Sequence, residues 1–192
     1  MSLLEITGLT HSFGENLLYK NAGFTLNKGE HIGIVGQNGT GKSTLIKICT
    51  EQIIPDSGRV IWQPNITIGY LDQYAEIDHT LTMKEFLKSA FAKLFEIETQ
   101  VMQLYEKAAD GDMKNLELAA YYQEQLETHD FYSIDTAIER VANGLGLLAI
   151  GLDRPIIEMS GGQRAKVILA KLLLEKPDVL LLDCLLYTSD AA

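Results

Sequence analysis

The chain is poor in cysteine and in basic residues, and each shortage excludes a class of protein. Its two cysteines, Cys49 and Cys184, lack the spacing of a metal site and are too few for a disulfide framework. Sixteen Lys and Arg stand against 26 Asp and Glu, which gives a formal net charge of −10. This balance disfavours broad, non-specific binding to nucleic acid, because such binding needs an excess of cations that releases counterions.

Long hydrophobic runs are also missing. No stretch approaches the roughly 20 consecutive apolar residues of a membrane span. A secretory signal has a basic segment followed by an apolar one, and the first residues lack this pattern, so no secretory signal is predicted. We therefore expect a cytoplasmic protein without membrane insertion. At 192 residues and 46% hydrophobic content, the chain can build one domain core with a subdomain.

The strongest positive feature is a glycine-rich motif. Residues 36–43 read Gly-Gln-Asn-Gly-Thr-Gly-Lys-Ser, the P-loop pattern that cradles phosphate. The backbone amides of residues 39–43 are expected to point at the anion at the start of a helix. Lys42 would reach the β- and γ-phosphates, and the Ser43 hydroxyl would coordinate Mg²⁺. The predicted nucleotide-binding residues here are Gly36, Asn38, Gly39, Thr40, Gly41, Lys42, Ser43 and Thr44.

The surroundings of the motif support this interpretation against a glycine turn without a ligand. The apolar residues 31–35 before it predict a strand, and residues 43–50 after it predict a helix. The first third of the chain is predicted to be rich in β-strands, over residues 3–9, 23–26, 59–62 and 66–70.

The middle of the chain changes to helical patterns. Thr82 and Glu85 form a predicted capping box at the start of a helix over residues 83–104. Residues 108–112 are expected to break this helix, and further helices are predicted over 113–128 and from 134 to about 145. A last helix over 161–174 should stop before Pro177. The apolar run 179–183 predicts a strand buried on both faces of a parallel sheet.

Three more features narrow the range of P-loop proteins. Residues 159–163 read Met-Ser-Gly-Gly-Gln at the start of the 161–174 helix, where Ser160 can act as N-cap and the amides form a second anion site. Asp183 ends an apolar strand, which is the place of a Walker B carboxylate that holds Mg²⁺. Gln73 lies at the border of the helical part and could bring an amide oxygen to the metal.

Taken in this order, the motifs resemble those of the ATP-binding cassette (ABC) family over residues 2–183. The resemblance implies an α/β fold, namely the P-loop NTPase nucleotide-binding domain of ABC proteins. Such a domain has a β-rich N-terminal part, a parallel-sheet core and an inserted helical subdomain. The expected cofactors are ATP and Mg²⁺. The resemblance implies that Lys42, Gln73 and Asp183 are catalytic. It also implies that Ser43, Gln73 and Asp183 bind the metal ion.

The resemblance also implies how the adenine base is bound and that the chain pairs with a second cassette. Phe13 matches the aromatic residue that stacks on adenine, although a simple packing role is the alternative. ABC cassettes pair head to tail, so the signature residues would contact the γ-phosphate of ATP held by a second cassette, which is expected on the same chain of the parent protein. The signature residues are Ser160, Gly161, Gly162 and Gln163.

Within the family, the chain resembles the ABC-F group. Gln73 and Ser160 are 87 residues apart, longer than in ordinary transporter cassettes, and the excess falls around residues 83–128. The resemblance implies a soluble ATPase of two cassettes that acts in translation at the ribosomal exit site or protects the ribosome, with an inserted helical arm toward ribosome and tRNA. Residues 93–130 carry three lysines and nine acidic residues, however, so this arm is a poor phosphate binder. Either the arm contacts ribosomal protein, or the basic contacts lie in the other half of the parent protein, or the arm is an ordinary solvated helical face.

Two other functions stay open from the sequence. One is the ATP-binding subunit of a membrane transporter, which would use the same nucleotide chemistry. The other is a nucleotide-binding module without turnover.

The end of the chain departs from the family pattern. Cys184 stands where a catalytic Glu is expected, and a thiol cannot orient and polarise the attacking water as a carboxylate does. Residues 184–192 resemble the conceptual translation of a sequencing-library adapter and are expected to be a non-native tail. We therefore expect an incomplete nucleotide-binding domain over residues 1–183, with a helical subdomain over 81–159. It should bind MgATP weakly and hydrolyse it at or near background, whereas the parent protein should be an active ATPase.

Overall fold

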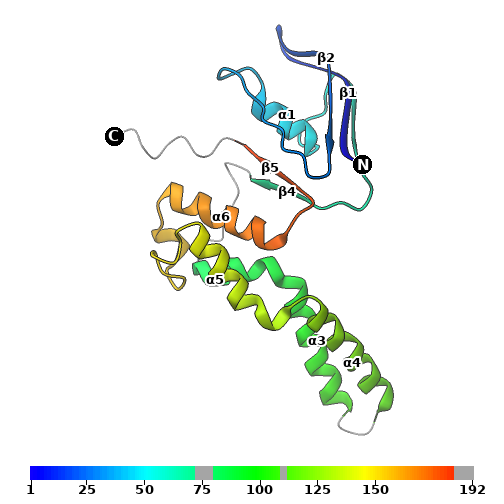
Figure 1. Ribbon diagram of the computed structural model, residues 1–192, viewed down its shortest axis with the longest axis vertical. Helices are drawn as coiled ribbons and strands as arrows, with labels where there is room; N and C mark the ends of the chain where they lie inside the picture. The colour runs from blue at the N-terminus through cyan, green and yellow to red at the C-terminus, as the bar shows by residue number, and fades with distance from the viewer. Residues whose placement is uncertain (72–79, 109–111, 184–192) are drawn as a thin grey trace. The chain divides into compact units, whose positions relative to one another are not determined.

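The computed structural model describes residues 1–71, 80–108 and 112–183, which form two compact units (Figure 1). Among the described residues, the first unit combines residues 1–71 with residues 177–183, and the second comprises residues 80–108 and 112–176. Each unit has a hydrophobic core of its own. The predicted helical subdomain, residues 81–159, lies inside the second unit.

The first unit begins with an antiparallel sheet. Strands β1 (Ser2–Phe13), β2 (Asn16–Asn27) and β3 (Ser57–Trp62) pair in the order β2-β1-β3. The side chains of Leu4, Ile6 and Leu9 on β1 are buried and pack with residues of helix α1 (Lys42–Cys49). The strands predicted at 3–9, 23–26 and 59–62 are confirmed, and the first two are longer than predicted because they continue into one hairpin.

A second, parallel pair brings the far end of the chain into the same unit. Strands β4 (Ile68–Leu71) and β5 (Val179–Leu182) pair in register from Ile68 with Val179 onward. The Asp178 carboxylate accepts hydrogen bonds from the amide and the hydroxyl of Thr67, at 2.8 and 2.9 Å, and so fixes the start of this pairing. The position of Asp183, directly after β5, follows from this register.

The strand predicted at residues 31–35 is wrong. These residues form no strand, and Val35 is 96% exposed. Ile32 and Ile34 instead line an apolar cavity of about 510 Å³ together with residues of β5. The run is apolar enough for a strand, but Gly33 in its middle packs no side chain, and strand formation requires a ladder partner that an apolar pattern does not specify.

This difference also changes the environment of β5. Within the described residues β5 pairs with β4 alone, and Leu182 is 52% exposed. The prediction that this strand is buried on both faces is therefore wrong, because only Val179 is buried, Leu180 and Leu181 are half-buried, and Leu182 is exposed.

The second unit is helical. Its elements are α2 (Met83–Lys88), the 3₁₀ turn η1 (Ser89–Phe91), α3 (Ala92–Ala108), α4 (Met113–Thr128), η2 (Phe131–Ser133), α5 (Ile134–Gly144), η3 (Ile156–Glu158) and α6 (Gly161–Glu175). The predicted helices are confirmed, with one correction: the helix expected over 83–104 is interrupted at η1. The Ser89 hydroxyl donates to the carbonyl of Phe86 at 2.6 Å, and such a side-chain bond competes with regular helix.

Buried side chains from α2, α4, α5, α6 and the turns hold the second unit together. The largest fully buried side chains are those of Met83, Leu87, Leu126, Ile138, Leu147, Ile156 and Val167. Helices α3 and α4 lie side by side and extend from this core as a hairpin (Figure 1). In the described ranges, no helix combines the length and the hydropathy that crossing a bilayer requires.

Candidate nucleotide site

The predicted phosphate loop is a compact turn followed directly by a helix. Residues 38–40 form a turn, and α1 begins at Lys42 with Gly41 as its N-cap. Gly41 has φ of +100° and Gly39 has φ of +85°, a region that side chains rarely adopt, so both positions favour glycine. The Thr40 amide donates weakly to the Gln37 carbonyl at 3.4 Å. Within the described part of the chain, the amides of residues 39, 41, 42 and 43 donate to no internal acceptor.

Gly41 is also closely approached by another strand. A Cβ atom at this position would lie 2.5 Å from the Tyr19 hydroxyl and 3.2 Å from Leu18 Cδ1. The Tyr19 hydroxyl donates a hydrogen bond to the Gly41 carbonyl, and partial burial raises the pKa of this hydroxyl. The first turn of α1 is thus held from β2, and a residue larger than glycine does not fit there.

Lys42 is directed at the loop itself. Its Nζ donates to the carbonyls of Gly36 and Gln37, at 2.9 and 2.8 Å. These contacts keep the ammonium group beside the loop amides, where it adds positive charge to an already electropositive helix start.

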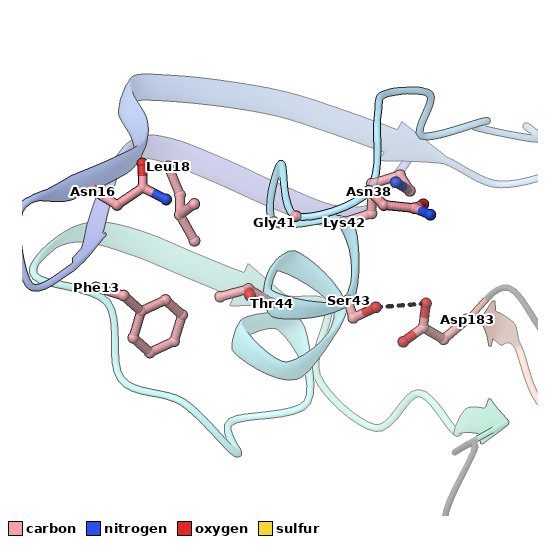
Figure 2. A pocket seen from close by; sticks show the side chains of 10 residues that line it. Phe13, Asn16, Leu18, Asn38, Gly41, Lys42, Ser43, Thr44 and Asp183 are labelled. Atoms are coloured by element: carbon pink, nitrogen blue, oxygen red, sulfur yellow. Dashed lines mark hydrogen bonds between the residues drawn. The ribbon is translucent and has the colours of Figure 1, made fainter.

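Ser43 and Asp183 come together although they are 140 residues apart. The Ser43 hydroxyl donates to Asp183 Oδ1 at 3.0 Å, as Figure 2 shows. Leu181 of β5 packs against the cluster that includes Ile48 and Cys49 of α1, which brings β5 next to this helix. The result is a pair of hard oxygen donors at the edge of the loop.

A cavity of about 490 Å³ adjoins these groups. It is lined by Phe13, Asn16, Leu18, Asn38, Gly39, Gly41, Lys42, Ser43, Thr44 and Asp183. In Figure 2 the ring of Phe13 and the side chains of Asn16 and Leu18 lie at one end, and Lys42, Ser43 and Asp183 lie at the other. The cavity therefore offers an apolar and amide-bearing end for a ring and a charged end for phosphate.

Three residues of this region were not found from the sequence: Asn16, Leu18 and Tyr19. They belong to β2, which carries no motif. The turn at Gly14 and Glu15 is the one signal that could have located Asn16, because a hairpin there pairs Phe13 with Asn16.

The remaining predicted site residues lie elsewhere. Ser160 is the N-cap of α6 in the second unit and takes part in a full capping box: its hydroxyl accepts from the Gln163 amide at 3.3 Å, and Gln163 Oε1 accepts from the Ser160 amide at 2.9 Å. Gly161 and Gly162 form the first turn of that helix. Gln73 lies outside the described residues.

Cys49 takes no part in this chemistry. It is buried at the end of α1, and burial raises the pKa of its thiol to about 11. Such a thiol is protonated at neutral pH and unreactive.

Comparisons with known proteins agree with the geometry of this site. A sequence model of the family described as "ABC transporter" matches residues 19–184. The crystal structure of a nucleotide-free ATP-binding cassette from an ABC transporter superposes with a TM-score of 0.57 at 23% identity, and covers 95% of this chain and 69% of that one. At this identity, the likeness shows the fold alone.

Curated relatives are more similar in sequence. The uncharacterized ABC transporter ATP-binding protein YfmM of Bacillus subtilis is 46% identical over 95% of this chain and 36% of its own length. ABC transporter F family member 2 of Arabidopsis thaliana is 32% identical over 94% of this chain and 28% of its own. The energy-dependent translational throttle protein EttA of Escherichia coli K12 is 36% identical over 86% of this chain and 30% of its own.

The chain thus spans about a third of the length of these relatives. The family match covers most of the chain and includes the loop, the helix start and the strand end that line the charged end of the cavity, whereas Phe13, Asn16 and Leu18 lie before the matched range. The chain belongs to the ABC family, as an ATP-binding cassette of the ABC-F type.

Proposed function

We propose that this chain is the MgATP-binding cassette of a two-cassette ABC-F ATPase that acts on the ribosome in translation. The observation that carries the nucleotide part is the arrangement at the start of α1. Amides without an internal acceptor, the Lys42 ammonium and the pair of Ser43 and Asp183 line one cavity. A polyphosphate with a divalent cation fits that set of groups.

The donor atoms suit Mg²⁺. The Ser43 hydroxyl and the Asp183 carboxylate are both hard oxygen ligands, which Mg²⁺ prefers, and they already lie 3.0 Å apart. When bound, the ion would neutralise charge that develops on the phosphate oxygens. Lys42 would leave the carbonyls of Gly36 and Gln37 to donate to the phosphates. Gln73 is proposed as a further metal ligand from its motif alone.

At the other end of the cavity, Phe13 is proposed to stack on adenine. Phe13 is 54% exposed and lines the cavity, so its ring is accessible to a base. Stacking of a base on an aromatic side chain contributes roughly 1–3 kcal/mol in proteins that bind single strands. Phe13 would thus add to affinity, and the phosphate contacts would supply the rest.

A second cassette would complete the catalytic site. The residues Ser160, Gly161, Gly162 and Gln163 are proposed to contact the γ-phosphate of ATP bound to the partner cassette. The amides at the start of the 15-residue helix α6 and its capping serine suit an anion there. The relatives are about three times as long as this chain, which leaves room for such a cassette in the parent protein.

The role in translation is supported by the relative whose name describes a translational throttle. The α3–α4 hairpin is proposed as the arm that contacts the ribosome. Its nine acidic residues against three lysines over 93–130 favour a basic ribosomal protein over RNA as its contact. The alternative is the ATP-binding subunit of a membrane transporter, which the name of the matching family would equally permit.

Nucleotide binding can be tested on the 192-residue chain. Titration with MgATP should show binding, and Lys42→Ala should weaken it at least tenfold because the phosphates lose a cation. Lys47→Ala is the matched control, since Lys47 lies in the last turn of the same helix and outside the cavity. Equal effects of the two substitutions would contradict the proposed site.

Turnover and the ribosomal role need separate measurements. We propose that the 192-residue chain hydrolyses ATP at or near background, since Cys184 replaces the expected carboxylate. Robust turnover that Lys42→Ala abolishes would contradict this. The full-length parent should co-sediment with ribosomes when a non-hydrolysable ATP analogue is present. Its absence from the ribosome pellet with and without the analogue would argue against a role in translation.

A further inference from the structure

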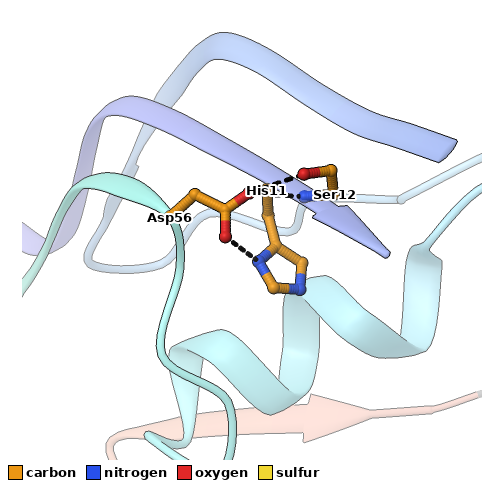
Figure 3. A network of polar contacts seen from close by, with 3 residues as sticks. All are labelled: His11, Ser12 and Asp56. Carbon is orange, nitrogen blue, oxygen red and sulfur yellow. Dashed lines mark hydrogen bonds and ion pairs between the residues drawn. The ribbon is translucent and has the colours of Figure 1, made fainter. Parts of the chain in front are cut away.

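A carboxylate beneath the end of β1 contacts both residues that precede Phe13. Oδ2 of Asp56 accepts hydrogen bonds from the Ser12 amide and the Ser12 hydroxyl, each at 2.8 Å (Figure 3). Its other oxygen, Oδ1, lies 3.6 Å from Nδ1 of His11. Asp56 is 44 residues from Ser12 in the sequence, so this tether is a tertiary contact.

His11 transmits this contact to the ring of Phe13. Its side chain is buried, with 6% of the residue exposed, and its ring meets the Phe13 ring edge to face at 4.9 Å and 82°. Neither ring nitrogen has a hydrogen-bond partner among the described residues. The position of His11 is therefore set by packing and by the charge of Asp56.

The local strand pairing alone does not hold Phe13 in place. The register of β1 with β2 is irregular between His11 and Ser12, just before Phe13 pairs with Asn16 at the end of the ladder. Gly14, the next residue, has φ of +59° and begins the turn. An exposed aromatic ring at an irregular strand end has little else to fix its orientation.

The carboxylate of Asp56 is ionised in the folded protein at neutral pH. The hydrogen bond from the Ser12 hydroxyl lowers the pKa of Asp56 below its ordinary value of 3.8, and the Ser12 amide and His11 act in the same direction. Asp56 is itself exposed to solvent, so its effect on the stability of the whole unit is small. Its effect on the neighbouring strand end is direct.

From these contacts we infer that Asp56 is a positioning residue for base recognition, which through Ser12 and His11 holds the Phe13 ring where it stacks on the base. This rests on the proposed function, since it needs a nucleotide in the cavity. Asp56 contacts no phosphate-binding group, so its role is confined to the base. Removing it should weaken binding of a nucleotide and leave binding of a bare polyphosphate unchanged.

The test compares two ligands on the 192-residue chain. The first is the Mg²⁺ complex of 2-aminopurine riboside triphosphate, whose base fluorescence is quenched by stacking. The second is Mg²⁺ tripolyphosphate, which has no base. Asp56→Ala should lower nucleotide affinity by about three- to tenfold and relieve the quench, with Phe13→Ala as the upper limit of the effect. Tripolyphosphate affinity should not change in either variant.

Two further variants separate positioning from general destabilisation. Asp56→Asn keeps an oxygen that accepts from Ser12 and should restore the quench. Glu30→Ala removes a carboxylate with a similar double contact, to the backbone amide and the side-chain amide of Asn27, but with no contact to Phe13 or to the cavity. It should leave both affinities unchanged.

Several outcomes would overturn the inference. One is that the fluorescence quench is unaltered in Asp56→Ala, and another is that this variant loses affinity equally for both ligands. A third is that Asp56→Asn binds the nucleotide as weakly as Asp56→Ala and also fails to restore the quench. A wild-type chain that binds neither ligand would instead contradict the proposed function. A wild-type chain that binds both while Asp56→Ala matches it would contradict the positioning role alone.

Discussion

At the scale of single residues, the site depends on contacts that connect distant parts of the sequence. The Tyr19 hydroxyl holds the carbonyl of Gly41, and Asp56 holds Ser12. Tyr19 acts on a residue of the P-loop and Asp56 acts on the residue before Phe13, yet neither Tyr19 nor Asp56 belongs to a motif. The two contacts also act at opposite ends of the cavity, so their effects on ligands should differ.

Tyr19→Phe should weaken binding at the phosphate end. The substitution removes one hydrogen bond and keeps the ring that packs beside α1. A typical bond contributes about 0.5–1.5 kcal/mol, so affinity should fall about two- to tenfold. Because the contact orders the loop and not the base, MgATP and Mg²⁺ tripolyphosphate should be affected equally in titration calorimetry.

Tyr132→Phe is the control for Tyr19→Phe, since Tyr132 is exposed and lies in the second unit. It should bind both ligands as the wild type does. A Tyr19→Phe variant that loses MgATP but not tripolyphosphate would show that Tyr19 acts on the base end, contrary to the contact with Gly41.

At the scale of helices and strands, the helices predicted from local sequence signals were confirmed, whereas the strand at residues 31–35, which needs a distant pairing partner, was predicted wrongly. The helices at 113–128, 134–144 and 161–175 could be predicted because their apolar spacing and caps are local in sequence. The structure of the segment 31–35 could not be predicted in this way, since a strand forms only with a partner strand and the apolar pattern does not identify that partner.

The same distinction applies to the candidate site. The P-loop residues and Asp183 could be found as motifs, because each is contiguous with its own element. Asn16, Leu18, Tyr19 and Asp56 could not, since they enter through hairpin register and contacts 22 to 44 residues apart. Sequence patterns reveal elements with periodic spacing, whereas these contacts join residues whose spacing in the sequence follows no period.

The capping box at α2 gives a direct test of element stability. Thr82 accepts from the Glu85 amide, and Glu85 accepts from the Thr82 amide at 2.8 Å. Thr82→Ala should cost about 0.5–2 kcal/mol of unfolding free energy. The midpoint of urea denaturation, followed by circular dichroism, should fall with an unchanged slope.

Thr128→Ala is the comparison for the Thr82 cap. The Thr128 hydroxyl donates to the carbonyl of Glu124 inside a helix and caps no helix start, so its loss should cost less. If both variants lowered the midpoint equally, the box at α2 would contribute nothing particular to this unit.

At the scale of the whole molecule, the two units carry separate sets of hydrogen-bonded carboxylates. In the first, the amide of Thr67, followed by its hydroxyl, lowers the pKa of Asp178 below 3.8. In the second, the hydrogen bond from Lys88 lowers the pKa of Asp135, with Lys84 acting in the same direction. Neither group is shared between the units, so their acid responses should be separable.

The sign of that response follows from the lowered pKa values. A carboxylate whose pKa is lower in the folded state stabilises it fully above the unfolded value of about 3.9, and this contribution is lost as pH falls through the folded value. Both units should therefore keep their stability from pH 7 to 5 and lose part of it below about pH 4. Hydrogen exchange of the β4–β5 and α5 peptides, each divided by its intrinsic rate, measures the two units independently.

Substitution of either carboxylate should remove this acid response from one unit only. Asn does not titrate, so Asp178→Asn should reduce the pH dependence of exchange in β4 and β5 and leave that of α5 unchanged. Asp135→Asn should do the reverse, because Asp135 lies in the first turn of α5 and pairs with lysines of α2. A single substitution that altered both peptides would show that the units unfold together, since only a shared transition carries a local loss of charge from one core to the other.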